Sequence, residues 1–297
     1  MIYFIVNPKA GSGKTKKAVS IISALMNKRG EEYSFVYTEK KDDAKRVSSL
    51  INFKKATAIV CIGGDGTLQE YVGICVGKDV SFGIIPLGSG NDFMCSVPDG
   101  MRKFRSFRRK IAYYTDKVVC RKTMLIDVLI VNGEKYCLNI GGTGMDIQIL
   151  KDAQPLKKIF GGASYFISLM KNVIFYRAEK MTLTTDGKSR TEKFLLLAFC
   201  NGAYYGGKLR IAPPAQINDG SITVCTVREM PLIKLVALFP LVKPGKHMKI
   251  KQVSFVDCLK ATLRFEGKRI VNLDGNLFEM KSPLTIEVVK GAVRLII

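Results

Sequence analysis

Three glycine-rich segments carry the residue types best suited to hold phosphate groups. They are NPKAGSGKT at residues 7–15, GGDGT at 63–67 and PLGSGNDF at 86–93, and each follows an apolar run typical of a strand. Glycine lets backbone N–H groups approach an anion closely, and a loop that opens a helix favours negative charge. Because Asp65 brings a carboxylate into such a cradle, a cation is needed there. Asp65 is therefore a candidate ligand of nucleotide-bound Mg²⁺ and, less directly, a candidate general base.

The first segment does not fit the Walker A pattern. That pattern would place a glycine where this chain has Pro8, and no later strand offers an obvious Walker B acid, so a P-loop fold is disfavoured. Taken alone, GGDGT is also compatible with a glycine-rich turn that exposes its aspartate. Three such loops after three successive strands are poorly explained by coincidence.

The first part of the chain alternates predicted strands and helices. Strands are expected at 2–6, 33–38, 56–62 and 81–85, with helices at 14–29, 42–51 and after Thr67. This order implies a parallel sheet with helical crossovers, and such sheets bind ligands at the edge where their strands end. The three glycine-rich loops should therefore meet at one edge.

After about residue 122 the pattern changes to strand, turn, strand, which predicts antiparallel hairpins. The turn signals are Asn132-Gly133, Asp186-Gly187, Glu266-Gly267 and Asp274-Gly275. Strands are expected at 123–131, 135–140, 181–186, 193–200, 221–227, 252–257 and 261–266, with helices at 162–176 and 231–242. The fold class is thus α/β plus mainly β, with an α/β domain over 1–122, which the C-terminal tail could rejoin, and a second domain over 123–297.

The net charge points to an anionic partner. The 297 residues include 47 Lys and Arg against 25 Asp and Glu, a formal charge of +22. Nucleic acid, a nucleotide or an anionic membrane would each answer to that charge. Basic residues gather at 102–122, interleaved with Phe104, Phe107, Tyr113 and Tyr114. This segment fits equally a helix that lies on a membrane and a solvated helix whose aromatic side chains enter the core.

Cysteine and histidine usage argues against a zinc site and against histidine catalysis. Eight cysteines without C-x-x-C spacing indicate free thiols of a reducing cytoplasm. The single histidine, His247, has no ligand-spaced neighbour, so neither a zinc site nor histidine catalysis is predicted. The apolar stretch at 232–242 contains Lys234 and Pro240 and is too short to span a bilayer. With no signal-peptide pattern either, we expect a cytoplasmic protein with peripheral membrane contact.

Together, NPKAGSGK, GGDGT and PLGSGNDF in this order resemble the catalytic domain of the diacylglycerol kinase family, whose soluble bacterial members are related to sphingosine and ceramide kinases. The resemblance continues through Gly202–Gly207, Ala212-Pro213, Asn218–Ser221 and Leu273–Gly275, so it covers nearly the whole chain. It implies transfer of a phosphoryl group from ATP to a lipid hydroxyl, with diacylglycerol the default acceptor.

The same resemblance implies an architecture and a set of partners. An N-terminal α/β nucleotide domain and a C-terminal antiparallel β-sandwich would hold ATP in the cleft between them. A lipid substrate, an anionic membrane surface and a homodimer are the implied partners. Nucleic acid is not expected, because no groove-reading motif is present.

The family's functional residues fall on matching positions of this chain. The implied ATP contacts are Asn7, Pro8, Lys9, Ala10 and Gly11 at the phosphates, Thr38 on the nucleoside side, Gly64, Asp65, Gly66, Thr67, Leu68, Gln69 and Glu70 at the phosphates again, and Ser89, with Asn91 and Asp92 as braces. The implied structural Mg²⁺ site is Gln216, Asp219 and Ser221, where Asp219 offers the only carboxylate. An Asn-Asp-Gly turn would form at 218–220 without any metal.

One departure concerns the proton acceptor. The family usually reads Asp-Gly-Glu where this chain has Asp274, Gly275 and Asn276, and the missing Glu is the residue assigned as base. Asparagine cannot accept a proton at neutral pH, although loose phosphoryl-transfer transition states depend more on positioning than on a strong base.

The candidate catalytic residues are therefore Asp65, Asp274 and Asn276 at the position of the family Glu, while Glu279 stands three residues away from that position. A lipid kinase and a catalytically silent lipid- or nucleotide-binding paralogue both remain open. An NAD kinase, which would share only GGDGT, and a nucleic-acid binder explain fewer of the motifs.

Overall fold

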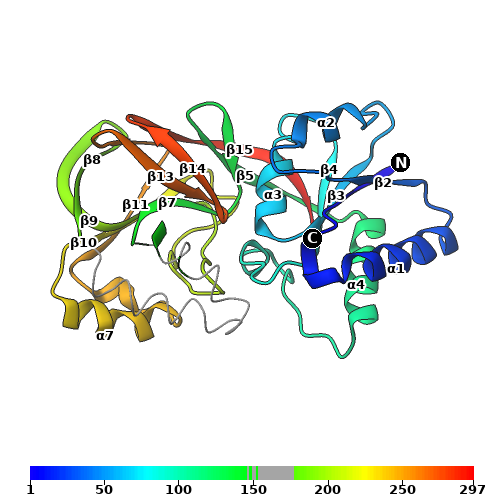
Figure 1. The fold of residues 1–297 in the computed structure, drawn as a ribbon, viewed down its shortest axis with the longest axis horizontal. Helices are drawn as coiled ribbons and strands as arrows, with labels where there is room; N and C mark the ends of the chain where they lie inside the picture. The colour runs from blue at the N-terminus through cyan, green and yellow to red at the C-terminus, as the bar shows by residue number, and fades with distance from the viewer. Residues whose placement is uncertain (146, 149–151, 153–176) are drawn as a thin grey trace. The chain divides into compact units, whose positions relative to one another are not determined.

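The computed structural model describes residues 1–145, 147, 148, 152 and 177–297, so the helix predicted at 162–176 lies outside the described residues. The chain divides into two compact units (Figure 1). The first unit comprises Met1–Ile126 and Gly291–Ile297, and the second comprises Asp127–Lys290. The expected combination of a parallel α/β unit and an antiparallel β unit is confirmed.

The first unit is built on a parallel sheet. Its strands lie in the order β2 (Tyr33–Tyr37), β1 (Ile2–Val6), β3 (Ala58–Gly63) and β4 (Ser81–Pro86), and all adjacent pairs are parallel. Every residue of β1 and β3 is buried, as expected of parallel strands covered on both faces. The end of β15 (Leu284–Ile296) adds to β4, where Arg294 and Leu295 pair in parallel with Ser81 and Phe82.

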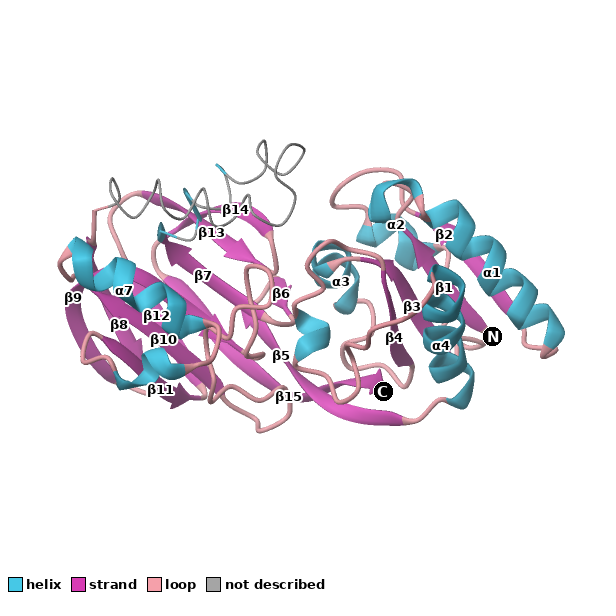
Figure 2. Cartoon of the chain, turned by 90° about the horizontal axis from the view of Figure 1, so that it is seen from below, coloured by secondary structure: helices cyan, strands magenta, loops and turns pink. Residues whose placement is uncertain are grey.

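Helices cover this sheet. They are η1 (Ala10–Gly13), α1 (Thr15–Lys28), α2 (Ala44–Ser49), α3 (Asp65–Val72), η2 (Phe93–Cys95) and α4 (Phe107–Cys120). Buried Ala18, Ile22 and Met26 recur every four residues along α1 and form its inward stripe, which explains why the segment becomes a helix against a core. Helices α1 and α4 pack against each other beside the strands (Figure 2).

Most of the basic segment at 102–122 forms helix α4, whose two tyrosines pack against Phe104. Ser106 begins α4, because its hydroxyl accepts a hydrogen bond from the Arg109 N–H. Phe104 packs against Tyr113 and Tyr114 with ring centroids 5.2 and 5.8 Å apart. No large apolar side chain of this fully described segment is exposed.

In the second unit, every strand pair with a defined register is antiparallel. Its strands are the end of β5 (Thr123–Val131), β6 (Lys135–Cys137), β7 (Ile140–Gly144), β8 (Glu179–Thr185), β9 (Lys188–Cys200), β10 (Ile222–Arg228), β11 (Val253–Cys258), β12 (Lys260–Arg264), β13 (Lys268–Leu273), β14 (Asn276–Lys281) and most of β15. The order β14-β13-β7-β9-β8-β12-β15 carries a branch in which β10 joins β9 to β11, while β5 pairs with β6 and β15. Strand β9 is the hub, because its first half pairs with β8 and its second half with β7 and β10.

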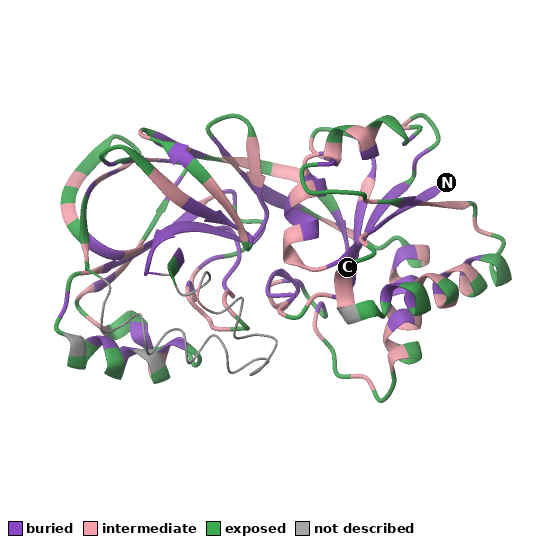
Figure 3. Cartoon of the chain, viewed as in Figure 1, coloured by how far each residue is buried: buried purple, intermediate pink, exposed green. Residues whose placement is uncertain are grey.

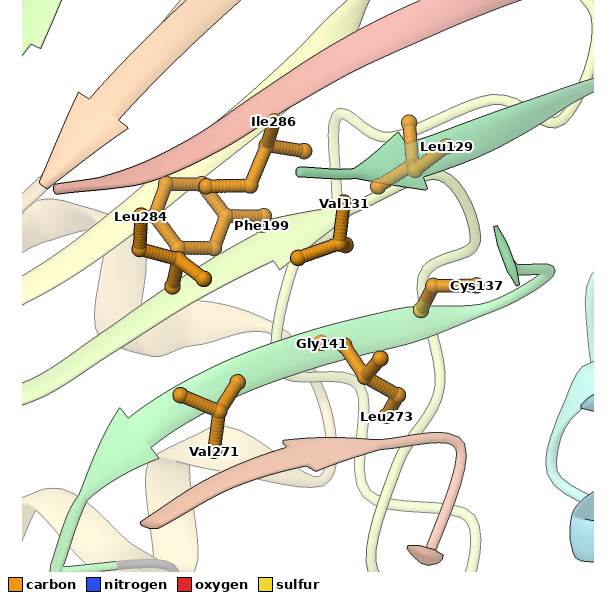
Figure 4. Close-up of a pocket in the computed structure, with 9 residues that line it drawn as sticks. All are labelled: Leu129, Val131, Cys137, Gly141, Phe199, Val271, Leu273, Leu284 and Ile286. Carbon is orange, nitrogen blue, oxygen red and sulfur yellow. The ribbon is translucent and has the colours of Figure 1, made fainter. Parts of the chain in front are cut away.

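Apolar side chains from these strands fill the interior. The close-up in Figure 4 shows Phe199, Leu284 and Ile286 near Val131, with Val271 and Leu273 on the neighbouring hairpin. The gap between them has no space for a water-sized sphere, so it is packed core and not a chamber for a lipid tail.

One helix and one short turn of helix complete the described part of the second unit. Helix α7 (Leu232–Val242) confirms the helix predicted at 231–242, and η4 (Lys246–Lys249) follows it. Leu235, Leu238 and Val242 of α7 are buried in a second apolar cluster with residues of β9, β10 and β11. Among the described residues, no helix is long and apolar enough to cross a bilayer.

Candidate functional site

The loops that follow β3 and β4 touch each other through glycine. The Leu87 and Gly88 N–H groups donate to the Gly63 carbonyl at 2.7 and 3.1 Å. A Cβ atom on Gly88 would lie only 2.5 Å from the Gly64 Cα atom. The two backbones can approach this closely only because neither residue has a side chain.

The loop after β1 joins the same place. The Asn7 side-chain amide donates to the Thr67 hydroxyl at 3.2 Å, and the Asn7 N–H donates to the Ile62 carbonyl. A Cβ atom on Gly11, whose φ is 65°, would lie 3.3 Å from the Leu87 Cβ atom. All three glycine-rich loops therefore meet at the ends of β1, β3 and β4, as the sequence predicts.

Asp65 begins α3 at the centre of these loops. Its carboxylate accepts hydrogen bonds from the N–H groups of Asp92 and Phe93 at 3.1 and 3.2 Å. A Cβ atom on Gly90 would lie 3.3 Å from the Asp65 Oδ2 atom and 3.4 Å from the Asp92 Oδ2 atom, so the two carboxylates flank one glycine. Burial, followed by the Asp92 charge, raises the pKa of Asp65 to about 6.

These two carboxylates are a suitable donor set for Mg²⁺. Mg²⁺ binds through one or two carboxylates together with substrate phosphates and water, and a cation would relieve the repulsion that raises the Asp65 pKa. Asn91 holds the loop beside them in a left-handed conformation with φ of 53°, and its amide donates to the Gly88 carbonyl at 2.6 Å. Ser89 lies exposed at the tip of this loop.

A charged network that the sequence reasoning missed lies between the end of β2 and helix α3. The Asp43 carboxylate accepts two hydrogen bonds from Arg46 at 2.9 and 2.6 Å, and the pKa of Asp43 is lowered to about 2, mainly by this partner. Arg46 also donates to the Tyr37 carbonyl, and the Asp43 N–H donates to Glu70 at 2.7 Å. The network ties the segment after Thr38 to α3, which carries the GGDGT loop.

The Asp274 side chain bonds to the connection between β6 and β7 in the second unit. Its buried carboxylate accepts hydrogen bonds from the N–H groups of Leu138, Asn139 and Ile140 at 2.6, 2.9 and 2.9 Å, and from the Cys137 thiol. Burial raises the pKa of Asp274 to about 6, although these four donors lower it. Its acceptor sites are thus occupied by the connection from β6 to β7.

Asn276 stands on the other side of the same turn. Asp274 and Gly275 both have positive φ, 49° and 93°, which is the two-residue hairpin geometry that Asp-Gly favours between β13 and β14. The Gly275 N–H donates to the Asn272 side chain at 2.8 Å. Asn276, half-buried, begins β14 directly after this turn.

The loop at 216–221 wraps around a residue absent from the sequence prediction, Asp127. The Asp127 N–H donates to the Ile217 carbonyl at 2.7 Å, and the Asp127 Oδ2 atom accepts from the Gly220 N–H at 2.6 Å. The Asp219 Oδ1 atom accepts from the N–H and the hydroxyl of Ser221, both at 2.9 Å. The signal for Asp127 was available, because an acid inside the apolar strand TMLIDVLIV needs a partner.

A Mg²⁺ ion at this loop would depend on few side-chain ligands. Among the described residues, no group of three or more His, Cys, Asp or Glu side chains is placed to hold a metal ion. Asp219 is exposed, and it is the one carboxylate among the three residues implied for this site.

Two family models match this chain, one over its N-terminal part and one over its C-terminal part. Residues 1–129 match the family model described as the diacylglycerol kinase catalytic domain, and residues 140–297 match the YegS C-terminal NAD kinase beta sandwich-like domain. A diacylglycerol kinase of Mycobacterium tuberculosis (strain ATCC 25618 / H37Rv) is 27% identical over 297 residues, covering 98% of this chain and 93% of that protein. A diacylglycerol kinase of Bacillus subtilis (strain 168) is 25% identical over 274 residues, covering 91% and 88%.

Solved structures show the same fold. A structure of a diacylglycerol kinase from Bacillus anthracis str. Sterne has a TM-score of 0.70 at 22% identity, covering 99% of this chain and 96% of that chain. The second family model alone spans more than half of the chain, and the two models together leave only a short connection unmatched. The chain therefore belongs to the bacterial diacylglycerol kinase family of lipid kinases.

Proposed function

We propose that this protein transfers the γ-phosphoryl group of ATP to the hydroxyl of diacylglycerol at the surface of an anionic membrane, with Mg²⁺ bound to the nucleotide. The observation that carries the proposal is the meeting of three glycine-rich loops around Asp65. Phosphoryl transfer depends chiefly on positioning and on neutralising charge, and backbone N–H groups beside a cation-binding carboxylate supply both.

Each candidate residue then has a role. The segment Asn7–Gly11 and the segment Gly64–Glu70 would hold the phosphates, and Thr38 would contact the nucleoside. Asp65 and Asp92 would hold the cation that accompanies the nucleotide. In the second unit, the loop of Gln216, Asp219 and Ser221 would hold a further Mg²⁺ with a structural role.

The turn at Asp274 supports a second candidate, a paralogue that binds its ligands without turnover. Asn276 cannot act as a base, and the Asp274 carboxylate already accepts four hydrogen bonds from its own unit. A substitute base at this turn is therefore hard to find, whereas the phosphate-binding loops are intact.

Incubation with γ-labelled ATP, Mg²⁺ and mixed micelles of diacylglycerol and anionic phospholipid tests the two candidates. Labelled phosphatidic acid, absent with Asp65→Asn, would establish the kinase and exclude the silent paralogue. Failure to label any lipid of a broad extract, by a protein that still binds ATP in equilibrium dialysis, would overturn the kinase proposal and favour the paralogue.

A further inference from the structure

Helix α7 is apolar on two sides, and within the part of the chain that the structure describes only one of these sides packs into a buried cluster. Leu235, Leu238 and Val242 face the core of the second unit. On the other side, Ile233 is 79% exposed and Val236 is 39% exposed, three residues apart and therefore neighbours on the helix surface. Figure 3 shows that exposed stretches make up much of this helix. Met248 of η4 adds a third exposed apolar side chain at 44%. Exposed apolar side chains that lie together on a surface often mark an interaction site.

Within the segment that carries these side chains, the charged residues are all of one sign. From Pro231 to Gln252 the chain contains no Asp or Glu, and it contains five lysines, all of which are exposed: Lys234, Lys243, Lys246, Lys249 and Lys251. We call these lysines together with Ile233, Val236 and Met248 the α7 patch. Exposed apolar side chains surrounded by lysine are the composition of helices that lie in the interface of an anionic bilayer.

The α7 patch is held firmly on the second unit. The buried His247 ring bonds to the Ile211 carbonyl through Nε2 at 2.9 Å and packs edge-on against Phe255 at 5.7 Å between ring centroids. Gly245, with φ of 74°, turns the chain between α7 and η4, where a side chain would meet Pro213. Met248 and its flanking lysines are thereby fixed beside α7 and need no ordering on contact.

We propose that the α7 patch is the surface with which this protein rests on anionic phospholipid, inserting Ile233, Val236 and Met248 among the acyl chains while the lysines contact headgroup phosphates. The proposal deepens the proposed function, because an acceptor dissolved in a bilayer is reached only by a protein bound to that bilayer. A protein partner fits less well, since lysine is depleted at protein interfaces whereas this segment exposes five lysines.

Vesicle sedimentation with the full chain tests this surface. Wild type should bind vesicles of phosphatidylcholine with phosphatidylglycerol and bind pure phosphatidylcholine weakly. Ile233→Gln/Val236→Gln, which keeps good helix formers on α7, should bind the anionic vesicles at least about tenfold more weakly. Lys246→Gln/Lys249→Gln should also lose binding, in proportion to the anionic lipid content.

Matched controls keep the test specific. Leu50→Gln/Leu259→Gln removes two exposed apolar side chains elsewhere, and Lys54→Gln/Lys55→Gln removes two exposed lysines elsewhere; both should bind like wild type. The proposal would be overturned if the α7 variants bound vesicles like wild type, or if the controls lost as much binding. It would also be overturned if wild type formed a dimer that the α7 substitutions dissociate. The binding assay requires no catalysis, and the mixed-micelle assay of each variant reports the proposed function separately, so failure of one is distinguishable from failure of the other.

Discussion

Asp65 and Asp92 place two carboxylates beside one phosphate-binding loop, and burial of Asp65 together with the Asp92 charge makes the site sensitive to pH. With a pKa of about 6, Asp65 is ionised above that pH and neutral below it. Because only the ionised form can hold Mg²⁺, kcat/KM for ATP should fall about tenfold per pH unit below pH 6. Asp92→Asn removes the neighbouring charge, so it should lower the Asp65 pKa and move this acid limb to lower pH.

A pH–rate profile of lipid phosphorylation checks this expectation. Asp99→Asn is the control, because Asp99 is an exposed aspartate of the same unit whose left-handed φ of 51° asparagine tolerates. An acid limb that stays in place in Asp92→Asn would contradict the assignment, whatever the variant does to the maximal rate.

Asp274 allows a structural role to be separated from a catalytic one. In Asp274→Asn the amide nitrogen would replace the Oδ2 atom, which accepts from the Leu138 N–H, so two donors would face each other in a buried site. The free energy of unfolding should fall by about 1–3 kcal/mol. Urea denaturation measures the loss, with the exposed Asp99→Asn as control. Loss of activity without loss of stability would instead assign Asp274 to the chemistry.

Asn276 decides how far the reaction depends on a base at this turn. General-base catalysis contributes roughly 10²–10⁴-fold, so Asn276→Glu should raise kcat at least about tenfold while KM for ATP stays unchanged. Steady-state phosphorylation of diacylglycerol measures both constants. Glu279→Gln should leave kcat unaltered, since Glu279 is exposed and paired with Lys268. Equal kcat in wild type and Asn276→Glu would show that no base is required there.

At the scale of elements, the Asp43–Arg46 network positions the segment after β2. Arg46→Met keeps the aliphatic part of the side chain but removes its bonds to Asp43, Glu39 and the Tyr37 carbonyl. Since Thr38 is a proposed nucleoside contact, KM for ATP should rise several-fold with a smaller change in kcat. ATP titrations at saturating lipid measure KM and kcat separately. Lys45→Met on the same helix is the control, and an unchanged KM in Arg46→Met would remove the network from nucleotide binding.

The elements of the first unit were predictable because each apolar run is continuous and each loop carries its own glycine signal. Strand β7, with the sequence IGGTG, has few strand-forming residues and was predicted only in part, within a single strand at 135–140. Its glycines serve long-range packing, since a Cβ atom on Gly142 would lie 2.7 Å from the Leu197 carbonyl. Strands β13, β14 and β15 were also not predicted, although the Asp274-Gly275 turn between the first two was.

Long-range contacts also limit how much of the site can be predicted from the sequence. Asp65 can be recognised as a candidate site residue because glycines flank it in the sequence. The hydrogen-bond partner of Asp127, Gly220, stands 93 residues further along the chain. Nothing local in the sequence connects such pairs. For α7 the helix was predictable, but its buried and exposed stripes are both apolar, so only the fold tells which side meets the core.

At the scale of the whole molecule, the formal charge of +22 adds a general attraction to any anionic surface. This attraction is screened by salt, because the Debye length falls from about 10 Å at 0.1 M to about 3 Å at 1 M ionic strength. Insertion of apolar side chains is not screened in this way. The two contributions to vesicle binding should therefore separate in a salt titration.

Wild type should lose part of its binding to anionic vesicles as ionic strength rises from about 0.1 M to about 1 M, and retain the part that insertion supplies. Ile233→Gln/Val236→Gln should bind only through charge, so its binding should vanish at high salt. Lys246→Gln/Lys249→Gln should show a shallower salt dependence with the residual binding preserved. Sedimentation across the salt range measures all three, and a residual in Ile233→Gln/Val236→Gln equal to that of wild type would mean that other side chains of the molecule insert.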